Sequence, residues 1–283
     1  MMKRQFNAGA NGVENLSGRT ALVTGAGSGI GRATAIALAK QGAYVIVTDI
    51  DPERAEQTCE HILGEGLRAV SRVLDVADPR AIEAMAAELH SSGDTPDILV
   101  NNAGIAVGGY FLDTGEESWQ RVVDINLMGV VRCCRAFVPH MVAGGKPGQV
   151  VNIASILGQL AVPGVSAYCM TKFGVVGFSE SLRAELAEHR IGVSTICPGM
   201  VRTNIVSAGL LESSDDDFEQ KQQSIEALFE KRNFPPERVA KAIVKAIRKN
   251  RAVVPVAPEA WLGYYLKRWA PWLVRGIAKR IRP

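Results

Sequence analysis

The stretch TALVTGAGSGIG, Thr20 to Gly31, decides the fold class of this chain. Its first half is apolar and β-branched, which predicts a buried strand, and its glycines predict a tight turn into a helix. Glycines let the backbone approach a pyrophosphate, and the free N–H groups at the start of a helix attract the negative charge. The candidate phosphate-binding residues are Gly25, Ser28, Gly29, Ile30 and Gly31. Because glycine turns also serve ordinary connections, the rest of the sequence has to support this interpretation.

Short apolar runs alternate with helical patterns along the rest of the chain. Further strands are expected at 43–49, 69–76, 97–104, 148–155, 191–199 and 252–256. Helices are expected up to Gln41, from Pro52, from Pro79, over 119–141, over 166–189 and from Pro235. This alternation predicts one α/β domain over residues 16–257, with a doubly wound parallel sheet of Rossmann type. Around it we expect a flexible arm over 1–15, a substrate-loop insert over 204–234 and a basic aromatic tail over 258–283.

Composition and charge argue against several classes of protein. The chain has 283 residues and is 47% hydrophobic, which is enough for one large domain. The net charge is +3, but residues 260–283 hold six Lys or Arg and no acid. Without that segment, 26 basic residues stand against 29 acidic ones. The basicity is therefore local, so a nucleic acid is not an expected partner.

Cysteine and histidine usage points to a reducing compartment and to no metal site. The five cysteines are odd in number and lack paired spacing, and the four histidines are far apart. The basic N-terminus has no apolar segment behind it, so we expect no secretory signal and a cytoplasmic location. The uncharged run from Pro147 to Thr171 contains Pro163 and several polar residues. It predicts a buried strand and an active-site loop rather than a membrane span.

Asp49 bears on the choice of cofactor. It ends the second expected strand, 18 residues after Gly31. A carboxylate at this place accepts hydrogen bonds from the adenosine ribose and repels the 2′-phosphate of NADP. The alternative is a helix cap before Pro52, for which Asp51 is the better candidate. The sequence therefore favours NAD over NADP.

Tyr168 and Lys172 are four residues apart in an expected helix, so they lie on the same face. Alone, such a pair is most often a packed ring beside a surface lysine. Ser155, at the end of the expected strand 148–155, comes 13 residues before Tyr168. These three residues are the candidate catalytic set.

The motifs, taken in order, resemble the short-chain dehydrogenase/reductase family, in its single-domain branch. The resemblance extends from about Leu16 to Val256 and rests on the following residues: TGAGSGIG at 24–31, Asp75 and Val76, NNAG at 101–104, Asn126, Ser155, YCMTK at 168–172, and Pro198 with Gly199. It implies a nicotinamide-dependent oxidoreductase. A homodimer or homotetramer is expected from the resemblance alone.

The resemblance also implies roles for further residues. Asp75 and Val76 would contact the adenine, and Asn102, Ala103 and Gly104 would lie on the adenosine ribose side. Val201 and Thr203 would bind the nicotinamide carboxamide, next to Pro198 and Gly199. Lys172 would bind the nicotinamide ribose, and Asn126 would hold a water in a proton path. Each has an ordinary alternative, such as a helix cap for Asp75 or a buried, satisfied amide for Asn126.

The expected chemistry is acid–base catalysis by Tyr168. A free phenol has a pKa near ~10, and about 4 kcal/mol of phenolate stabilisation would bring it towards ~7. A unit charge at about 4 Å supplies roughly that amount at an effective dielectric near 20. We therefore expect Lys172, helped by the positive nicotinamide ring of the oxidised cofactor, to lower the pKa of Tyr168, and Ser155 to hold the substrate oxygen. The rival interpretation is a non-catalytic dinucleotide-binding sensor or scaffold.

The substrate and the tail are less defined by sequence. Apolar stretches near 104–112, 155–164 and 200–211 suggest a lipophilic secondary alcohol or ketone, although the same residues suit an ordinary core. On a helical wheel, Leu262, Tyr265, Trp269, Leu273 and Ile277 share one face, with Pro271 as a kink. This pattern suits contact of residues 260–283 with a membrane surface, packing over the substrate site or a neighbouring subunit, or disorder.

Overall fold

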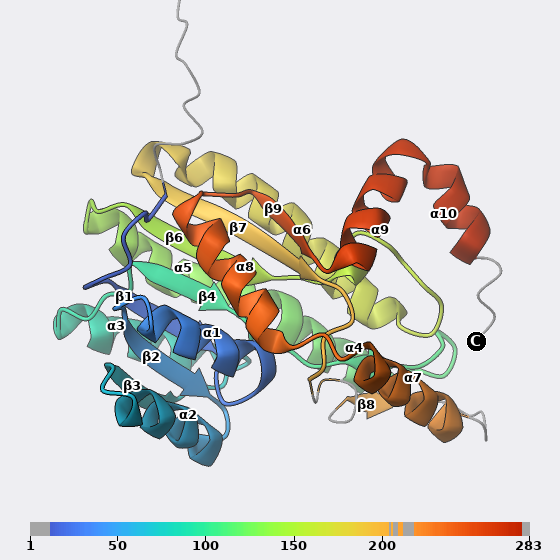
Figure 1. Ribbon diagram of the computed structural model, residues 1–283, viewed down its shortest axis with the longest axis horizontal. Coiled ribbons are helices and arrows are strands. Elements are labelled where there is room, and N and C mark those ends of the chain that lie inside the picture. Colours follow the sequence, from blue (N-terminus) through green and yellow to red (C-terminus); the bar gives the residue numbers. More distant parts are fainter. Residues whose placement is uncertain (1–11, 204, 206–208, 212–217, 279–283) are drawn as a thin grey trace, which may run out of the picture.

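A computed structural model of the chain describes residues 12–203, 205, 209–211 and 218–278 (Figure 1). Its main sheet consists of β1 Thr20–Thr24, β2 Tyr44–Asp49, β3 Ala69–Val73, β4 Ile98–Asn101, β6 Gly148–Ile153, β7 Ile191–Pro198 and β9 Val253–Val256. The order is β3-β2-β1-β4-β6-β7-β9, and every neighbouring pair is parallel. A small second sheet pairs β5 Val107–Gly108 with β8 Leu210–Leu211. The expected doubly wound α/β fold is confirmed.

Helices cover both faces of the main sheet. One core contains side chains of α1 Gly29–Ala39, α2 Pro52–Gly64 and α8 Pro236–Arg248. The opposite core contains side chains of α3 Pro79–Ser91, α5 Gly129–Ala143 and α6 Ser166–Glu185. Neighbouring positions of one strand point to opposite cores, as Leu22 and Val23 do, so the strands are apolar throughout.

The sheet reverses its direction of growth between β1 and β4. The chain runs outward from β1 to β3, returns to β4, and then continues outward to β9. At such a switch point the loops at the carboxyl ends of the two strands separate, which leaves a crevice for a ligand. The glycine loop follows β1 at this place.

The remaining helices lie at the carboxyl ends of the strands or follow the last strand. They are α4 Glu116–Val123, α7 Phe218–Arg232, α9 Pro258–Trp269 and α10 Pro271–Ala278, and a 3-10 turn, Leu186–His189, ends α6. Figure 1 shows α9 and α10 at the end of the molecule towards which the strands point. No helix in the described ranges combines the length and the apolar character needed to cross a bilayer.

Two expected segments differ from the structure. Val13 is 1% exposed and belongs to the core, so residues 12–15 do not form a free arm, and residues 1–11 lie outside the described residues. The tail is two helices and not one kinked helix, because Ala270 leaves the helical conformation before Pro271. Within the insert 204–234, the structure describes β8 and α7, whereas 204, 206–208 and 212–217 lie outside it.

Candidate active site

The glycine loop forms a close-packed cradle at the start of α1. Gly25 and Gly29 have φ values of 62° and 50°, which disfavour any side chain with a Cβ atom. A Cβ on Gly31 would lie 2.1 Å from the carbonyl oxygen of Gly25. Ser28 is the N-cap of α1, yet its side chain makes no capping hydrogen bond, and the first turn contains no acid. The first N–H groups of this helix are therefore available to an anion.

A threonine that our sequence analysis did not assign holds the loop in place. Thr24 Oγ1 accepts hydrogen bonds from the backbone N–H groups of Asn102 and Ala103, at 3.0 Å each. The Asn102 amide donates to the carbonyls of Thr24 and Gly25, at 2.9 and 3.0 Å. The Asn102 side chain thus fixes the glycine loop, and the expected ribose contact stays a prediction for the backbone of residues 102–104. The signal in the sequence was the threonine that precedes the first loop glycine.

Asp49 is bound to the glycine loop rather than free. Its Oδ2 accepts from the backbone N–H of Gly27 at 2.9 Å, and its Oδ1 accepts from that of Asp51 at 3.0 Å. Asp51 caps α2 as expected, because its Oδ1 accepts from the N–H groups of Glu53 and Arg54. Arg54, which our sequence analysis passed over, also pairs with Asp51 at 3.0 Å. The carboxylate of Asp49 remains at the carboxyl end of β2, where the ribose is expected.

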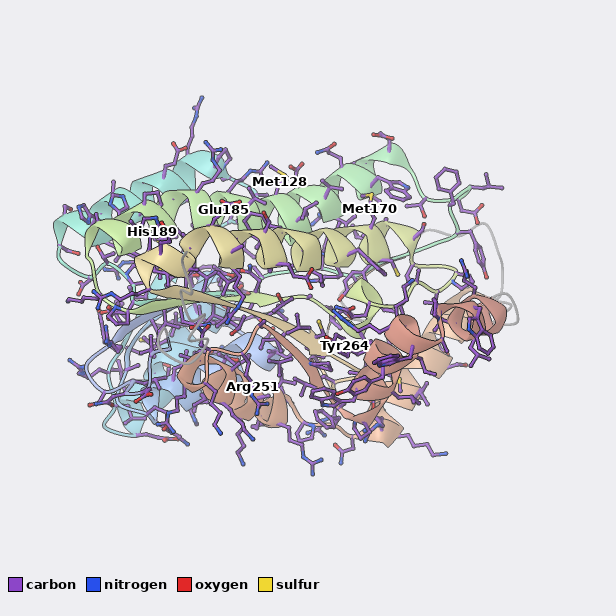
Figure 2. The ribbon with its side chains drawn as sticks, turned by 90° about the horizontal axis from the view of Figure 1, so that it is seen from above. Met128, Met170, Glu185, His189, Arg251 and Tyr264 are labelled. Atoms are coloured by element: carbon purple, nitrogen blue, oxygen red, sulfur yellow. The ribbon has the colours of Figure 1, made fainter. Side chains whose placement is uncertain are left out.

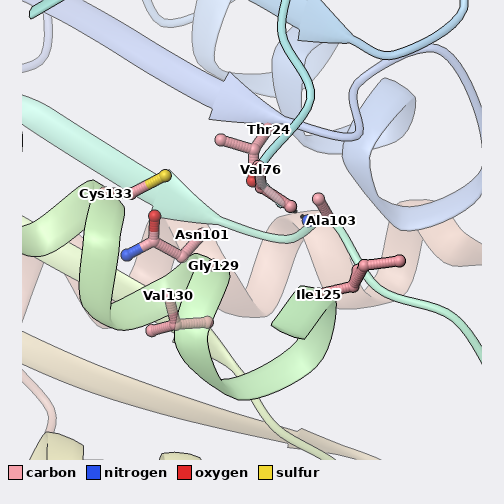
Figure 3. Close-up of a pocket in the computed structure, with 8 residues that line it drawn as sticks. All are labelled: Thr24, Val76, Asn101, Ala103, Ile125, Gly129, Val130 and Cys133. Carbon is pink, nitrogen blue, oxygen red and sulfur yellow. Dashed lines mark hydrogen bonds between the residues drawn. The ribbon is translucent and has the colours of Figure 1, made fainter. Parts of the chain in front are cut away.

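Asp75 and Val76 follow β3, and Val76 lies close to Ala103 in the loop that follows β4. Asp75 Oδ1 accepts from the N–H of Ala77 at 2.8 Å, whereas Asp78 caps α3, so Asp75 is not the helix cap. Figure 3 shows Val76 and Ala103 lining a narrow space together with Thr24. A Cβ on Gly129 would lie 3.0 Å from the Val76 Cγ2 atom. The glycine therefore lets the start of α5 approach the segment after β3 closely.

Asn126 lies in a π-helical turn, Asp124–Met128, between α4 and α5. Its Oδ1 accepts from the N–H of Ile105 and its Nδ2 donates to the carbonyl of Ile105, both at 2.8 Å. A Cβ on Gly104 would lie 3.0 Å from Asn126 Oδ1 and 3.5 Å from Lys172 Nζ. The side chain is fully buried and clamps the loop beside the lysine. Its role in a proton path stays a prediction.

Ser155, Tyr168 and Lys172 meet at the carboxyl end of β6. Ser155 leads into a 3-10 turn, Ile156–Gly158, and accepts from the N–H of Leu157 at 3.1 Å. Tyr168 and Lys172 share one face of α6, and the lysine Nζ lies 5.6 Å from the centre of the tyrosine ring. Lys172 is 4% exposed and donates to the carbonyl of Ile153 at 3.0 Å. These contacts fix a phenol, a hydroxyl and an amine at one point.

The pKa values of this group differ from our expectation. Burial raises the pKa of Tyr168 to about 12, while the hydrogen bond with Ser155 acts in the opposite direction. Burial also lowers the pKa of Lys172 to about 8, which the neighbouring Cys197 partly opposes. The expected lowering of this pKa by Lys172 together with the positive nicotinamide ring stays a prediction for the complex with the oxidised cofactor.

The family model for short chain dehydrogenases matches residues 19–213 of the chain. The match begins just before the glycine loop and extends beyond the candidate catalytic residues Ser155, Tyr168 and Lys172. The chain belongs to the short-chain dehydrogenase family. The predicted resemblance is confirmed.

Relatives of this short-chain dehydrogenase carry general names. "Probable oxidoreductase EphD" of Mycobacterium tuberculosis is 42% identical over 260 residues, which cover 91% of this chain but 44% of the relative. The chain thus spans less than half of the length of that protein. "Oxidoreductase UcpA" of Escherichia coli is 40% identical over 205 residues, with 72% of this chain and 77% of the relative covered.

Solved structures support the fold in more detail. A short-chain dehydrogenase/reductase from Burkholderia phymatum, determined in complex with NAD, superposes with a TM-score of 0.85 at 26% identity. The superposition covers 92% of this chain and 96% of that chain. A short-chain dehydrogenase from Streptomyces avermitilis gives a TM-score of 0.77 at 31% identity, over 91% and 97% of the two chains.

The loop after β7 closes the cofactor side of this short-chain dehydrogenase. A Cβ on Gly29 would lie 3.1 Å from Thr203 Cγ2, so Thr203 lies against the glycine loop. Val201 is 3% exposed and packs in the core, which leaves its backbone for the expected carboxamide contact. Pro198 ends β7 and Gly199 follows it. Of the residues expected around the nicotinamide, Thr203 therefore lies against the glycine cradle, and the roles of Pro198, Gly199 and Val201 stay predictions.

Glu259 of α9 is a neighbour of this loop that our sequence analysis missed. A Cβ on Gly199 would lie 2.5 Å from Glu259 Oε1, and the same oxygen accepts from the N–H of Met200 at 3.2 Å. Its Oε2 accepts from Arg232 at 3.1 Å, the last residue of α7. One carboxylate thus joins the loop after β7 to two helices, and no local sequence pattern marks such a contact between distant segments.

The residues present fit a nicotinamide dinucleotide. The uncapped start of α1, the glycine cradle and Asp49 would hold the pyrophosphate and the adenosine ribose. Thr203 lies against Gly29 of the cradle, and Lys172 lies close to Gly104 in the loop after β4. By contrast, the described residues contain no cluster of side chains suited to a metal ion.

Proposed function

We propose that this short-chain dehydrogenase is an NAD-dependent alcohol dehydrogenase or carbonyl reductase that acts on a secondary alcohol or ketone. The observation that carries the proposal is the position of Ser155, Tyr168 and Lys172 beside the glycine cradle. A protein that only binds a dinucleotide, as a sensor or a scaffold, has no need of a phenol hydrogen-bonded to a hydroxyl at this point.

The chain's own residues supply positioning and proton transfer. When bound, NAD supplies the hydride acceptor, and its reduced form supplies the hydride for the reverse reaction. Ser155 donates a hydrogen bond to the substrate oxygen and holds it beside the phenol. Tyr168 removes the hydroxyl proton during oxidation and returns one to the oxygen during reduction. Lys172 orients the nicotinamide ribose and stabilises the phenolate by its charge.

The raised pKa of Tyr168 has a consequence for direction. A phenol with a pKa of about 12 keeps its proton at neutral pH, so it is ready to donate to a carbonyl oxygen. Oxidation requires additional positive charge near the phenol, because Lys172 alone does not offset the cost of burial. We therefore propose that the chain on its own is poised for reduction.

The preference for NAD is supported by Asp49. Its carboxylate is fixed to the glycine loop by the Gly27 N–H, so it cannot turn away from a 2′-phosphate without losing that bond. Arg54 is the nearest candidate to offset this repulsion, but its guanidinium already pairs with Asp51. Repulsion of the 2′-phosphate therefore favours NAD over NADP.

A lipophilic substrate is supported by the wall beside Ser155. Ile156 and Leu160 follow the serine, and Gly263 of α9 packs so closely that a Cβ there would lie 2.6 Å from Leu160 Cδ1. Phe111 and Leu112, in the loop after β5, are 70% and 91% exposed. Apolar side chains around a few polar groups are typical of a site for a lipophilic molecule.

The assembly and the location of the protein are also part of the proposal. We propose a homodimer or homotetramer, as is usual in this family. A cytoplasmic location is supported by the five cysteines, all of which are buried and free.

The test measures reduced nicotinamide by absorbance, with NAD or NADP and a panel of secondary alcohols from small cyclic alcohols to steroids. We expect turnover with NAD, and we expect Tyr168→Phe to lower kcat by at least about 100-fold while the affinity for NAD stays within a few-fold. Tyr44→Phe is the matched control, because Tyr44 is also partly buried but begins β2, at the end of the strands opposite to the candidate site.

Two outcomes would contradict the proposal. If Tyr168→Phe retains most of the rate, the phenol is not the acid–base group. If the wild-type protein binds NAD and turns over no member of the panel, the sensor or scaffold interpretation gains support.

A further inference from the structure

We propose that α9 and α10 form a docking surface for an anionic lipid membrane, at the end of the molecule where the substrate site opens. The docking surface comprises the apolar side chains Trp261, Leu262, Tyr265, Trp269, Trp272 and Leu273 and the basic side chains Lys267, Arg268 and Arg275. The sequence left membrane contact, packing and disorder open for this segment, and the structure adds two observations that separate them.

The first observation is that the large apolar side chains of α9 and α10 point outward. Trp269 is 83% exposed, Trp272 63% and Leu262 62%. The residues that α9 turns to the body of the protein are small, since Ala260 is fully buried and Gly263 is buried as well. A helix that only packs on its own domain buries its apolar face, so this orientation indicates a second apolar phase.

The second observation is the charge of the segment. From Ala260 to the end of the chain there are six Lys or Arg and no acid. Arg268 lies over the ring of Tyr264, with its guanidinium carbon 4.6 Å from the ring centre. Aromatic side chains combined with lysine and arginine suit the headgroup region of an anionic lipid surface.

The charge also argues against a second copy of the chain as the occupant. A symmetric contact through this surface would place the same residues of both copies opposite each other. Lys267, Arg268 and Arg275 would then face like charges across a desolvated interface, which is unfavourable. A lipid surface with negative headgroups has the opposite sign.

The docking surface is fixed to the catalytic end of the molecule. Gly263 packs on Ile156 and Leu160, which follow Ser155, and Lys267 Nζ lies 5.8 Å from the ring centre of Phe173 on α6. Figure 2 places Met170, near the start of α6, and Tyr264 of α9 towards one end of the molecule, with His189 towards the other. A membrane bound to this surface would therefore lie beside the substrate wall.

The dimensions favour a helix pair that lies on the membrane. The 12 residues of α9 extend about 18 Å, less than the ~30 Å of a hydrocarbon core, and α10 is shorter still. Partial insertion of the exposed rings into the headgroup region needs no such length. The position of the membrane beside the substrate wall rests on the proposed function, whereas membrane docking itself does not.

The experiment is co-sedimentation of the full-length protein with phosphatidylcholine vesicles, without and with phosphatidylglycerol. We expect binding to the anionic vesicles that weakens with salt. Trp269→Ser combined with Trp272→Ser should weaken it at least about tenfold. Arg268→Gln and Arg275→Gln should each weaken it roughly fivefold. Leu63→Ser is the matched control, because Leu63 is an exposed apolar residue on α2, far from α9 in Figure 1.

Tryptophan fluorescence gives a second measurement on the same samples. Three of the four tryptophans lie in the docking surface, so anionic vesicles should shift the wild-type emission to shorter wavelength. The proposal is overturned if the wild type binds neither kind of vesicle, or if the double tryptophan variant binds as well as the wild type. A concentration-dependent dimer that the double variant abolishes, with no vesicle binding, would assign the surface to a second copy. Turnover of a water-soluble alcohol in the same preparations shows separately whether the proposed function holds.

Discussion

Lys172 has an unusual environment for a single residue, because its amine is buried without a carboxylate partner among the residues that the structure describes. Its Nζ donates to a backbone carbonyl, and burial lowers its pKa to about 8. In the unfolded chain the amine has an ordinary pKa near ~10.4, so the unfolded state binds the proton more tightly. A residue of the proposed catalytic set therefore lowers the stability of the fold at neutral pH.

A pH series with Lys172→Met tests this effect. Below about pH 8 the wild type carries a buried charge, and its stability should rise as the pH increases from about 8 towards about 10, where folded Lys172 is neutral. We expect Lys172→Met to be more stable than the wild type by about 1–3 kcal/mol at pH 7, by a smaller margin at pH 9.5, and to lack turnover.

Urea unfolding at each pH measures the difference. Lys241→Met is the control, because Lys241 is exposed on α8 and should give no pH-dependent change. A difference between wild type and Lys172→Met that stays constant from pH 7 to 9.5 would contradict the buried-charge explanation.

Among the elements, α9 joins parts of the site that are far apart in the sequence. Its Glu259 accepts from Met200 after β7 and from Arg232 at the end of α7. Ala257, two residues before Glu259, has a φ of 93°. Residues with a Cβ atom rarely adopt this backbone conformation. The surrounding contacts hold the chain in this strained turn, which sets the direction in which α9 starts.

Glu259→Gln tests α9 as a positioning element. The neutral side chain loses the ion pair with Arg232, while most of its volume remains. The two side chains are 32% and 29% exposed, so the loss of stability should stay at or below about 1 kcal/mol. If Glu259 positions the loop and α7, kcat/KM should fall by about 3- to 10-fold, mainly through KM for the alcohol.

Glu65→Gln provides a matched comparison, because Glu65 also pairs with a basic residue, Lys40, at 3.0 Å but lies far from the site. Equal kinetic constants in the two variants would show that Glu259 has a structural role only.

Local patterns predicted most of the elements and most of the site. The glycine loop, Asp51 as a cap and the Tyr168–Lys172 face each depend on neighbours within a few residues, which sequence spacing reports directly. Contacts between distant segments were missed, such as Thr24 with Asn102 and Glu259 with Arg232. Sequence spacing also did not predict that burial raises the pKa of Tyr168, because the depth of burial is a property of the packed structure.

For the whole molecule, the distribution of cysteines allows a prediction about alkaline stability. All five thiols are buried, and burial raises the pKa of Cys133 and of Cys197 to about 12. An unfolded thiol ionises near pH ~8.5, so from there upward the unfolded state is favoured by the loss of protons. The contribution of these two buried thiols to the free energy of unfolding is therefore fully present below about pH 8.5, and it decreases as the pH rises towards 12.

Thiol titration with a chromogenic disulfide checks the same burial. At neutral pH the native protein should react slowly or not at all, and five thiols should react after unfolding in denaturant. Rapid reaction of one or more thiols in the native protein would show that part of the core opens on the timescale of the reagent.

The order of strands in the sheet also governs when the fold can become complete during synthesis of the chain. β1 pairs with β2 soon after both are made, but its other neighbour is β4, so Leu22 waits for Leu99. At the far edge of the sheet, β7 pairs with β9, so Cys197 waits for Pro255. Glu259, which contacts Met200, is synthesised only after β9. Parallel pairings over such separations close slowly because long loops must be ordered first. A ribosome-bound chain can thus form its cofactor cradle long before the last strand and α9 complete the catalytic end, so nascent chains should acquire dinucleotide affinity earlier than turnover.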